Sequence, residues 1–85
     1  MLLIVDLSAK GESFPVDVLK KVDAVLSALG FRKEVHSVVK PGKQFSITYD
    51  GPNTDKSRIE EVLRTVAEQN EVNFSVEIEE SVKFP

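Results

Sequence analysis

The pattern of apolar and polar residues predicts four strands in this chain. One is a nearly continuous apolar run, and in the other three apolar and polar residues alternate, imperfectly over residues 31–39. The first, over residues 2–7, is almost entirely apolar, which is typical of a strand at the centre of a sheet. The segment over residues 31–39 carries charged residues on both of its faces and is therefore expected at a sheet edge. The remaining strands are expected over residues 45–49 and 72–79.

In two segments between these strands, the apolar residues recur with the period of an α-helix. Apolar residues recur there at spacings of three and four and make two amphipathic stripes: Val18, Leu19, Val22, Val25, Leu26 and Leu29, and then Ile59, Val62, Leu63 and Val66. For the first helix we expect Ser13 as the N-cap and Gly30 just past the end. For the second we expect Asn53 or Thr54 as the N-cap and Asn70 in the left-handed conformation at the end.

The order of these elements is βαββαβ, which is two strand–helix–strand units in succession. Right-handed crossovers then place both helices on the same face of the sheet. The sequence therefore predicts an α+β, ferredoxin-like sandwich, in which a four-stranded antiparallel sheet has the spatial order 4-1-3-2 and residues 1–85 form a single domain.

Composition excludes several kinds of chemistry. The 85 residues include no cysteine and one histidine, so disulfides, thiolate metal sites, cysteine nucleophiles and multi-histidine sites are not expected, and no cofactor is predicted. The longest apolar run, residues 1–5, is too short to span a membrane and lacks the flanks of a signal peptide. From the missing export signals and cysteines we expect a cytoplasmic protein.

The net charge of −3 is unevenly distributed. Residues 1–43 carry seven basic against five acidic side chains, whereas residues 44–85 carry four against nine. Because phosphate neutralisation supplies most of the affinity for nucleic acids, this acidic chain is not expected to bind them, nor to bind an anionic membrane surface.

One candidate site follows from the expected topology. The loop after the first strand and the turn between the second and third strands lie at one end of the sheet, where three lysines and two glycines would gather: Lys10, Gly11, Lys40, Gly42 and Lys43. Ammonium groups beside a helix N-terminus favour a small anion. The other interpretation is that these lysines flank turns for solubility and protect the sheet edge.

Acylphosphatases share this element order and approximate length and bind phosphate at the same end of the sheet. Their motif has an arginine in a glycine-rich first loop and an asparagine on the neighbouring strand. Residues 8–13 contain no arginine here, and the third strand has Ser46 and Thr48 but no asparagine. A small phosphohydrolase is thus a minor alternative to a protein that is not an enzyme.

The sheet face without helices is the second candidate site. It resembles the layout of an RNA recognition motif, yet that motif stacks bases on outward aromatic side chains, which this chain lacks on its first and third strands. Instead the face combines polar residues with a patch formed by Leu2, Ile4, Val38 and Thr48. Two copies could pack through this patch as a two-fold homodimer, or the face could simply be solvated.

Three other groups have simpler interpretations. His36, alone on an edge strand, is interpreted as a surface residue. Asp50, Asn53 and Asp55 suit turns and helix capping better than a calcium loop. The carboxylates near the end of the last strand are interpreted as a solvated acidic edge.

These observations favour a small non-catalytic interaction or assembly module, which associates with itself through the open sheet face or an edge strand, or which docks on another protein. A regulatory domain that binds an anionic metabolite near Lys10, Lys40 and Lys43 is the alternative.

Overall fold

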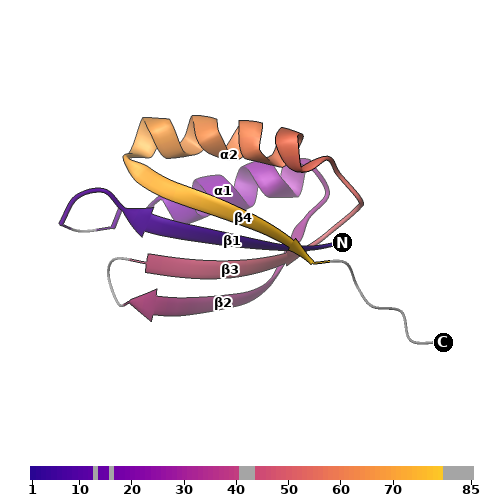
Figure 1. Ribbon diagram of the computed structural model, residues 1–85, viewed down its shortest axis with the longest axis horizontal. Helices are drawn as coiled ribbons and strands as arrows, with labels where there is room; N and C mark the ends of the chain where they lie inside the picture. The colour runs from indigo at the N-terminus through magenta and orange to yellow at the C-terminus, as the bar shows by residue number, and fades with distance from the viewer. Residues whose placement is uncertain (13, 16, 41–43, 80–85) are drawn as a thin grey trace.

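The computed structural model describes residues 1–12, 14–15, 17–40 and 44–79, and for residues 35–40 it describes the backbone alone (Figure 1). Four strands and two helices follow one another in the order β1 (Leu2–Ala9), α1 (Asp17–Ala28), β2 (Arg32–Lys40), β3 (Gln44–Asp50), α2 (Lys56–Asn70) and β4 (Val72–Glu79). The sheet has the order β2-β3-β1-β4, and each neighbouring pair is antiparallel. This order is the predicted 4-1-3-2 counted from the other edge, so the ferredoxin-like fold is confirmed.

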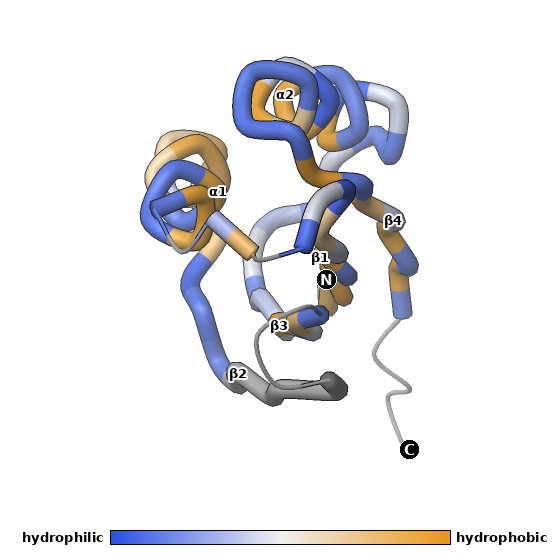
Figure 2. Tube along the Cα trace, turned by 90° about the vertical axis from the view of Figure 1, so that its left-hand side faces the viewer, coloured by the Kyte–Doolittle hydropathy of each residue, from blue (hydrophilic) through white to orange (hydrophobic). Residues whose placement is uncertain are grey.

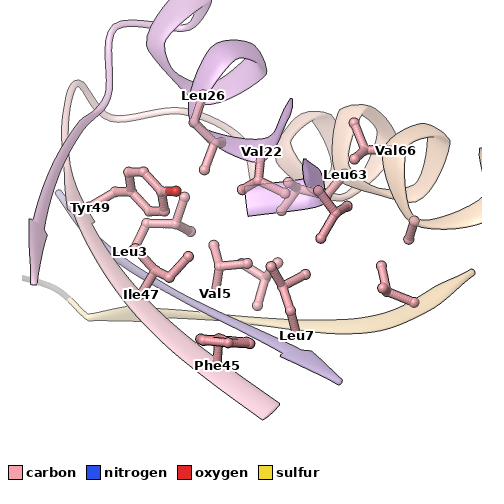
Figure 3. Packing of buried hydrophobic residues seen from close by; sticks show 14 of the residues in the cluster. Leu3, Val5, Leu7, Val22, Leu26, Phe45, Ile47, Tyr49, Leu63 and Val66 are labelled. Carbon is pink, nitrogen blue, oxygen red and sulfur yellow. The ribbon is translucent and has the colours of Figure 1, made fainter. Parts of the chain in front are cut away.

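Both helices lie on the same side of the sheet, with α2 nearer β4 and α1 nearer β2, and no helix of the described residues covers the other side (Figure 2). The hydrophobic core fills the space between the helices and the sheet (Figure 3). Alternate residues of the central strand point into this space, and Leu3, Val5 and Leu7 are each at most 1% exposed. Burying such a side chain contributes about 1.5–3 kcal/mol, so this row anchors the sandwich.

The register of β1 gives each of these buried residues an apolar partner on both neighbouring strands. Leu3 pairs with Tyr49 and Ile78, Val5 with Ile47 and Val76, and Leu7 with Phe45 and Phe74. The alternation predicted for the third and fourth strands is therefore confirmed, and it puts three apolar rows across the sheet on the helix side.

Strand β2 lies at a sheet edge, as its charges predicted, but it does not pair with β3 in one continuous register. The pairing shifts between Lys33 and Val35 and again between Val38 and Lys40. Such irregularities change the correspondence between a residue's number and its partner on the next strand. The single alternation predicted along residues 31–39 is therefore wrong for the backbone pairing.

The end of helix α1 confirms the prediction that Gly30 follows its last turn. Gly30 has a φ of 94° and donates its backbone N–H to the carbonyl of Ser27 at 2.9 Å, while Phe31 donates to the carbonyl of Leu26 at 2.9 Å. These two bonds form a Schellman motif, which uses carbonyls that the helix end would otherwise leave unpaired. The motif also directs Phe31, which is 4% exposed, into the core at the start of β2.

The N-cap of helix α2 lies one residue after Thr54 and two after Asn53, the two predicted N-caps. Asp55 is the N-cap residue, in an extended conformation and without a side-chain capping bond. The hydroxyl of Thr54, one of the two predicted caps, instead donates to the carbonyl of Pro52 at 3.0 Å. The predicted capping role of Asn53 or Thr54 is therefore wrong, because the preceding loop uses the threonine side chain to close its own turn.

The prediction for the other end of α2 is also wrong by one residue. Asn70 remains helical, and its side-chain amide donates to the carbonyl of Val66 at 2.8 Å. Glu71 adopts the left-handed conformation instead, with φ 54° and ψ 48°, and donates its N–H to the carbonyl of Ala67. The asparagine side chain therefore stabilises the last turn rather than the reversal that follows it.

One core residue was missed by the sequence analysis. Phe14 lies in the connection between β1 and α1, yet it is 6% exposed and its ring centroid is 4.6 Å from that of Phe45. No periodic pattern includes Phe14, so its burial follows from tertiary packing alone. Ser13, the expected N-cap of α1, lies outside the described part of the chain.

The two helices of the described chain are both too short and too polar to cross a membrane.

Replacing Gly51 with alanine should destabilise the protein, because a Cβ there would lie 2.5 Å from the Phe31 ring. An overpacked contact of this kind costs about 1–3 kcal/mol of unfolding free energy. Urea denaturation followed by circular dichroism measures the loss. Gly11→Ala is the matched control, since a Cβ at Gly11 meets nothing within 4 Å, and equal stabilities of the two variants would contradict the close approach of Gly51 to Phe31.

Candidate functional site

The loop after β1 follows β4 rather than the β2 edge. The backbone N–H of Lys10 donates to the carbonyl of Glu71 at 3.3 Å, which extends the pairing of β1 with β4 beyond Ala9. The end of β2 and the start of β3 lie at the same end of the sheet, but on the other side of β1 (Figure 1). The backbone therefore directs Lys10 toward the start of β4.

A cleft of about 270 Å³ opens beside this loop and is lined by Gly11, Glu12, Pro15, Asn70 and Glu71. Two of its five lining residues are carboxylates, and the C-terminal end of α2, which carries partial negative charge, also lies here. This electrostatic environment favours polar groups that donate hydrogen bonds and opposes an anion. The expected anion site gains no support from the surroundings of Gly11.

The other members of that predicted site cannot be placed. Gly42 and Lys43 lie outside the described residues, and only the backbone of Lys40 is described. The first turn of α1 already contains a carboxylate, that of Asp17, which partly offsets the positive end of the helix dipole. Anion binding by these lysines stays a prediction.

The open face is the side of the sheet that carries no helix. Its described side chains are the alternate residues of three strands, and those of β1 and β3 are half-buried while those of β4 are exposed: Leu2, Ile4, Asp6, Ser8, Gln44, Ser46, Thr48, Asn73, Ser75, Glu77 and Glu79. The face is mostly polar, with two aliphatic residues on its central strand.

The patch predicted on this face is brought together in part. Ile4 pairs directly with Thr48, and Leu2 lies two positions along the same side of β1. The backbone of Val38 pairs with Phe45, which belongs to the helix-covered side of β3, and the side chain of Val38 is outside the described part of the structure. Its place in the patch therefore stays a prediction, one that the register does not support.

The described charges of the open face are mainly negative. Asp6 lies at the centre, and Glu77 and Glu79 lie along β4. The basic Arg32, at the β2 edge, forms an exposed ion pair with Glu34 at 3.1 Å. A second copy stacked on this face would therefore bring carboxylates toward carboxylates.

A polar cluster joins α1 to the sheet on the helix side. The hydroxyl of Tyr49 donates a hydrogen bond to Asp23, and the other carboxylate oxygen of Asp23 lies 3.5 Å from Nζ of Lys33. Burial, with the hydrogen bond to Asp23 and its charge, raises the pKa of Tyr49 above the usual tyrosine range. Because Asp23 lies on α1 while Tyr49 and Lys33 lie on strands, this cluster links the helix to the sheet.

Metal binding gains no support from the described residues, among which no three His, Cys, Asp or Glu side chains converge on one point. Asp50 and Asp55 flank the connection between β3 and α2, and Asp55 is the N-cap residue there. The side chain of His36 is not described.

Comparison with solved structures identifies the same fold in two other proteins. An ACT domain protein from Streptococcus pneumoniae superposes with a TM-score of 0.70 over 91% of this chain and 88% of its own, at 14% sequence identity. A formyltetrahydrofolate deformylase from Pseudomonas putida KT2440 superposes with a TM-score of 0.67 over 93% of this chain, also at 14% identity. This chain covers 29% of the deformylase.

No protein family and no curated protein matches the sequence. At 14% identity the two solved structures establish the fold and nothing about a ligand or a reaction. One neighbour is close to this chain in length and the other is a much longer enzyme, so the fold occurs both in a small protein and as one part of a large one.

The buried environment of Tyr49 predicts a loss of stability in alkaline solution. Because its pKa is raised in the folded state, the unfolded chain releases this proton first, above pH of about 10. The stabilisation is therefore complete below that pH and declines above it, by at most about 1.4 kcal/mol per pH unit. The Tyr49→Phe substitution should lower the free energy of unfolding by about 1 kcal/mol at neutral pH. The stability of this variant should then decline less steeply above pH 10 than that of the wild type.

Tyr49 is the only tyrosine, and the chain has no tryptophan, so tyrosinate absorbance reports on this residue alone. We expect that absorbance to rise together with unfolding measured by circular dichroism. A rise near pH 10 in a protein that is still folded would show that the hydroxyl is neither buried nor bonded to Asp23.

Proposed function

We propose that this chain is a non-catalytic assembly module that associates with a second copy of itself through the uncovered surfaces of its sheet, either the open face or an edge strand. The proposal is supported chiefly by the one-sided architecture: both helices lie on one side, and among the described residues nothing covers the other side or the outer edge of β4. Small domains with little core commonly gain stability by associating.

The distribution of polar side chains supports a role without catalysis. The polar contact between Tyr49 and Asp23 uses both groups to hold a helix on the sheet. Nucleophilic catalysis needs a hydroxyl beside a base, whereas the hydroxyls of Thr54 and Thr65 donate to the backbone carbonyls of Pro52 and Glu61. A cytoplasmic location belongs to the same proposal and is supported by the absence of cysteine.

Sedimentation velocity tests the association directly. Over concentrations from about 1 μM to about 1 mM, the range in which weak complexes form, we expect a reversible shift from the 9.4 kDa chain to a species of twice that mass. A single monomeric species at every concentration would show that this chain does not assemble with itself.

A second candidate function is a regulatory domain that binds a small metabolite, and it is favoured by the cleft beside Gly11. The sequence predicts an anionic metabolite near Lys10, Lys40 and Lys43. The carboxylates of Glu12 and Glu71 favour a ligand that also carries hydrogen-bond donors.

A thermal-shift comparison tests this candidate with inorganic phosphate, a nucleotide, a dicarboxylate and an amino acid as probes. If the lysines hold an anion, phosphate or nucleotide raises the Tm, and the double variant Lys40→Ala with Lys43→Ala loses that rise. Lys56→Ala, at the opposite end of α2, is the control and should keep it. A rise with the amino acid alone, lost in Glu12→Gln, would place the ligand in the cleft instead.

A further inference from the structure

The two edges of the sheet differ in how well they could accept another strand. Edge strand β2 has two register shifts and begins with three charged, exposed residues, Arg32, Lys33 and Glu34. Bulges and charges of this kind hinder pairing with another chain. Edge strand β4 pairs with β1 through all eight of its residues without a shift, and it contains neither proline nor lysine. The β4 edge is therefore the one suited to pairing.

The hydrogen-bond pattern shows which residues of β4 face outward. Lys10 and Glu71 are opposite one another, and the N–H of Lys10 donates to the carbonyl of Glu71, so they form a hydrogen-bonded pair of the antiparallel ladder. Such pairs alternate with pairs whose backbone groups point away from the neighbouring strand. It follows that four residues of β4 direct their N–H and C=O groups to the free edge: Val72, Phe74, Val76 and Ile78.

These same four residues form the apolar, helix-side row of the strand. Val72 and Val76 are buried, at 1% and 7% exposure, whereas Phe74 and Ile78 pack against the core but remain half-exposed. A strand added at this edge would therefore satisfy the outward backbone groups and cover the exposed parts of Phe74 and Ile78 at the same time.

We propose that β4 pairs in antiparallel fashion with β4 of a second copy, about a two-fold axis near Ser75 and Val76, so that two four-stranded sheets join into one continuous sheet with all helices on one side. The inference rests on the self-association proposed above and assigns it to one surface. The interface is isologous, since each copy contributes the same strand.

Side-chain pairing across this axis is compatible with either of two adjacent registers. With Ser75 on the axis, Glu77 lies opposite Asn73 of the other copy; with Val76 on the axis, Glu79 lies opposite Asn73. With Ser75 on the axis, Glu79 also lies opposite Glu71, which precedes β4 of the other copy, so the register with Val76 on the axis is favoured because it places no described glutamate opposite another. Both registers place apolar residues opposite apolar residues on the helix side.

The charges of α2 are also complementary in this arrangement. Because α2 runs opposite to β4 on the same edge, the two-fold axis brings the N-terminal part of one α2 toward the C-terminal part of the other. Exposed Lys56 and Arg58 lie in the first turn of α2, before Glu60 and Glu61. Exposed Glu68 and the C-cap residue Glu71 lie at its other end. Stacking of two open faces would instead bring together the carboxylates of Asp6, Glu77 and Glu79, so the edge is the favoured surface.

Hydrogen exchange provides an internal control within the strand itself. As concentration rises through the dimerisation range, we expect the amide protons of Phe74, Val76 and Ile78 to become protected. Those of Ser75 and Glu77, which face β1, should be protected already in dilute solution. A dimer in which Phe74 and Val76 gain no protection would overturn the assignment to this edge.

Two variants test the same point by sedimentation. Val76→Pro removes an outward N–H and none that bonds β1, and proline is accepted on edge strands, so the dimer should weaken at least tenfold. Phe74→Lys adds a charge to the same row and should also weaken the dimer. It provides the test if Val76→Pro does not fold. Ile4→Asp, on the open face, is the control and should leave the dimer intact provided that circular dichroism shows it folded.

The outcomes separate the two proposals. A dimer that persists in both β4 variants but dissociates in Ile4→Asp would place the interface on the open face, which overturns the edge assignment and keeps the self-association. A wild-type chain that stays monomeric up to about 1 mM would overturn both.

Discussion

The structure depends on one buried row in the central strand. Leu3, Val5 and Leu7 lie in β1, which has a neighbour on each side, and all three point toward the helices. Because side chains alternate along a strand, a shift of one residue in the pairing of β1 would expose this row and bury Asp6. The apolar partners on β3 and β4 favour the observed register. The placement of both helices follows from the same row, since they are needed to cover it.

Because the helices cover one side of the sheet, three of its surfaces are open to another molecule: the open face, the β2 edge and the β4 edge. They differ in physical character. The open face is mostly polar and acidic, the β2 edge is irregular and charged at its start, and the β4 edge is regular, with apolar residues beside it. A function in assembly would depend on these differences rather than on the core, because a fold does not by itself determine a function.

Much of the fold was predictable from local patterns. The stripe of α1, the left-handed Gly30 and the alternation of β3 each follow from interactions between residues close in sequence. The candidate sites were less predictable. The topology brought Ile4 and Thr48 together as expected, but Gly11 came to lie among carboxylates from α2 and its own loop, which the positions of lysines along the chain did not indicate.

The sequence by itself determined the element types, the covered face and the strand order, because hydrophobic periodicity, helix-end glycine and crossover handedness act locally or through simple geometry. The tertiary structure alone decided the burial of Phe14, the link between Tyr49 and Asp23, and the register shifts of β2. The first two depend on contacts between segments far apart in the chain, and the third depends on how β2 pairs with the neighbouring β3. Their geometry is set by how the helices rest on the sheet, and no periodic pattern encodes it.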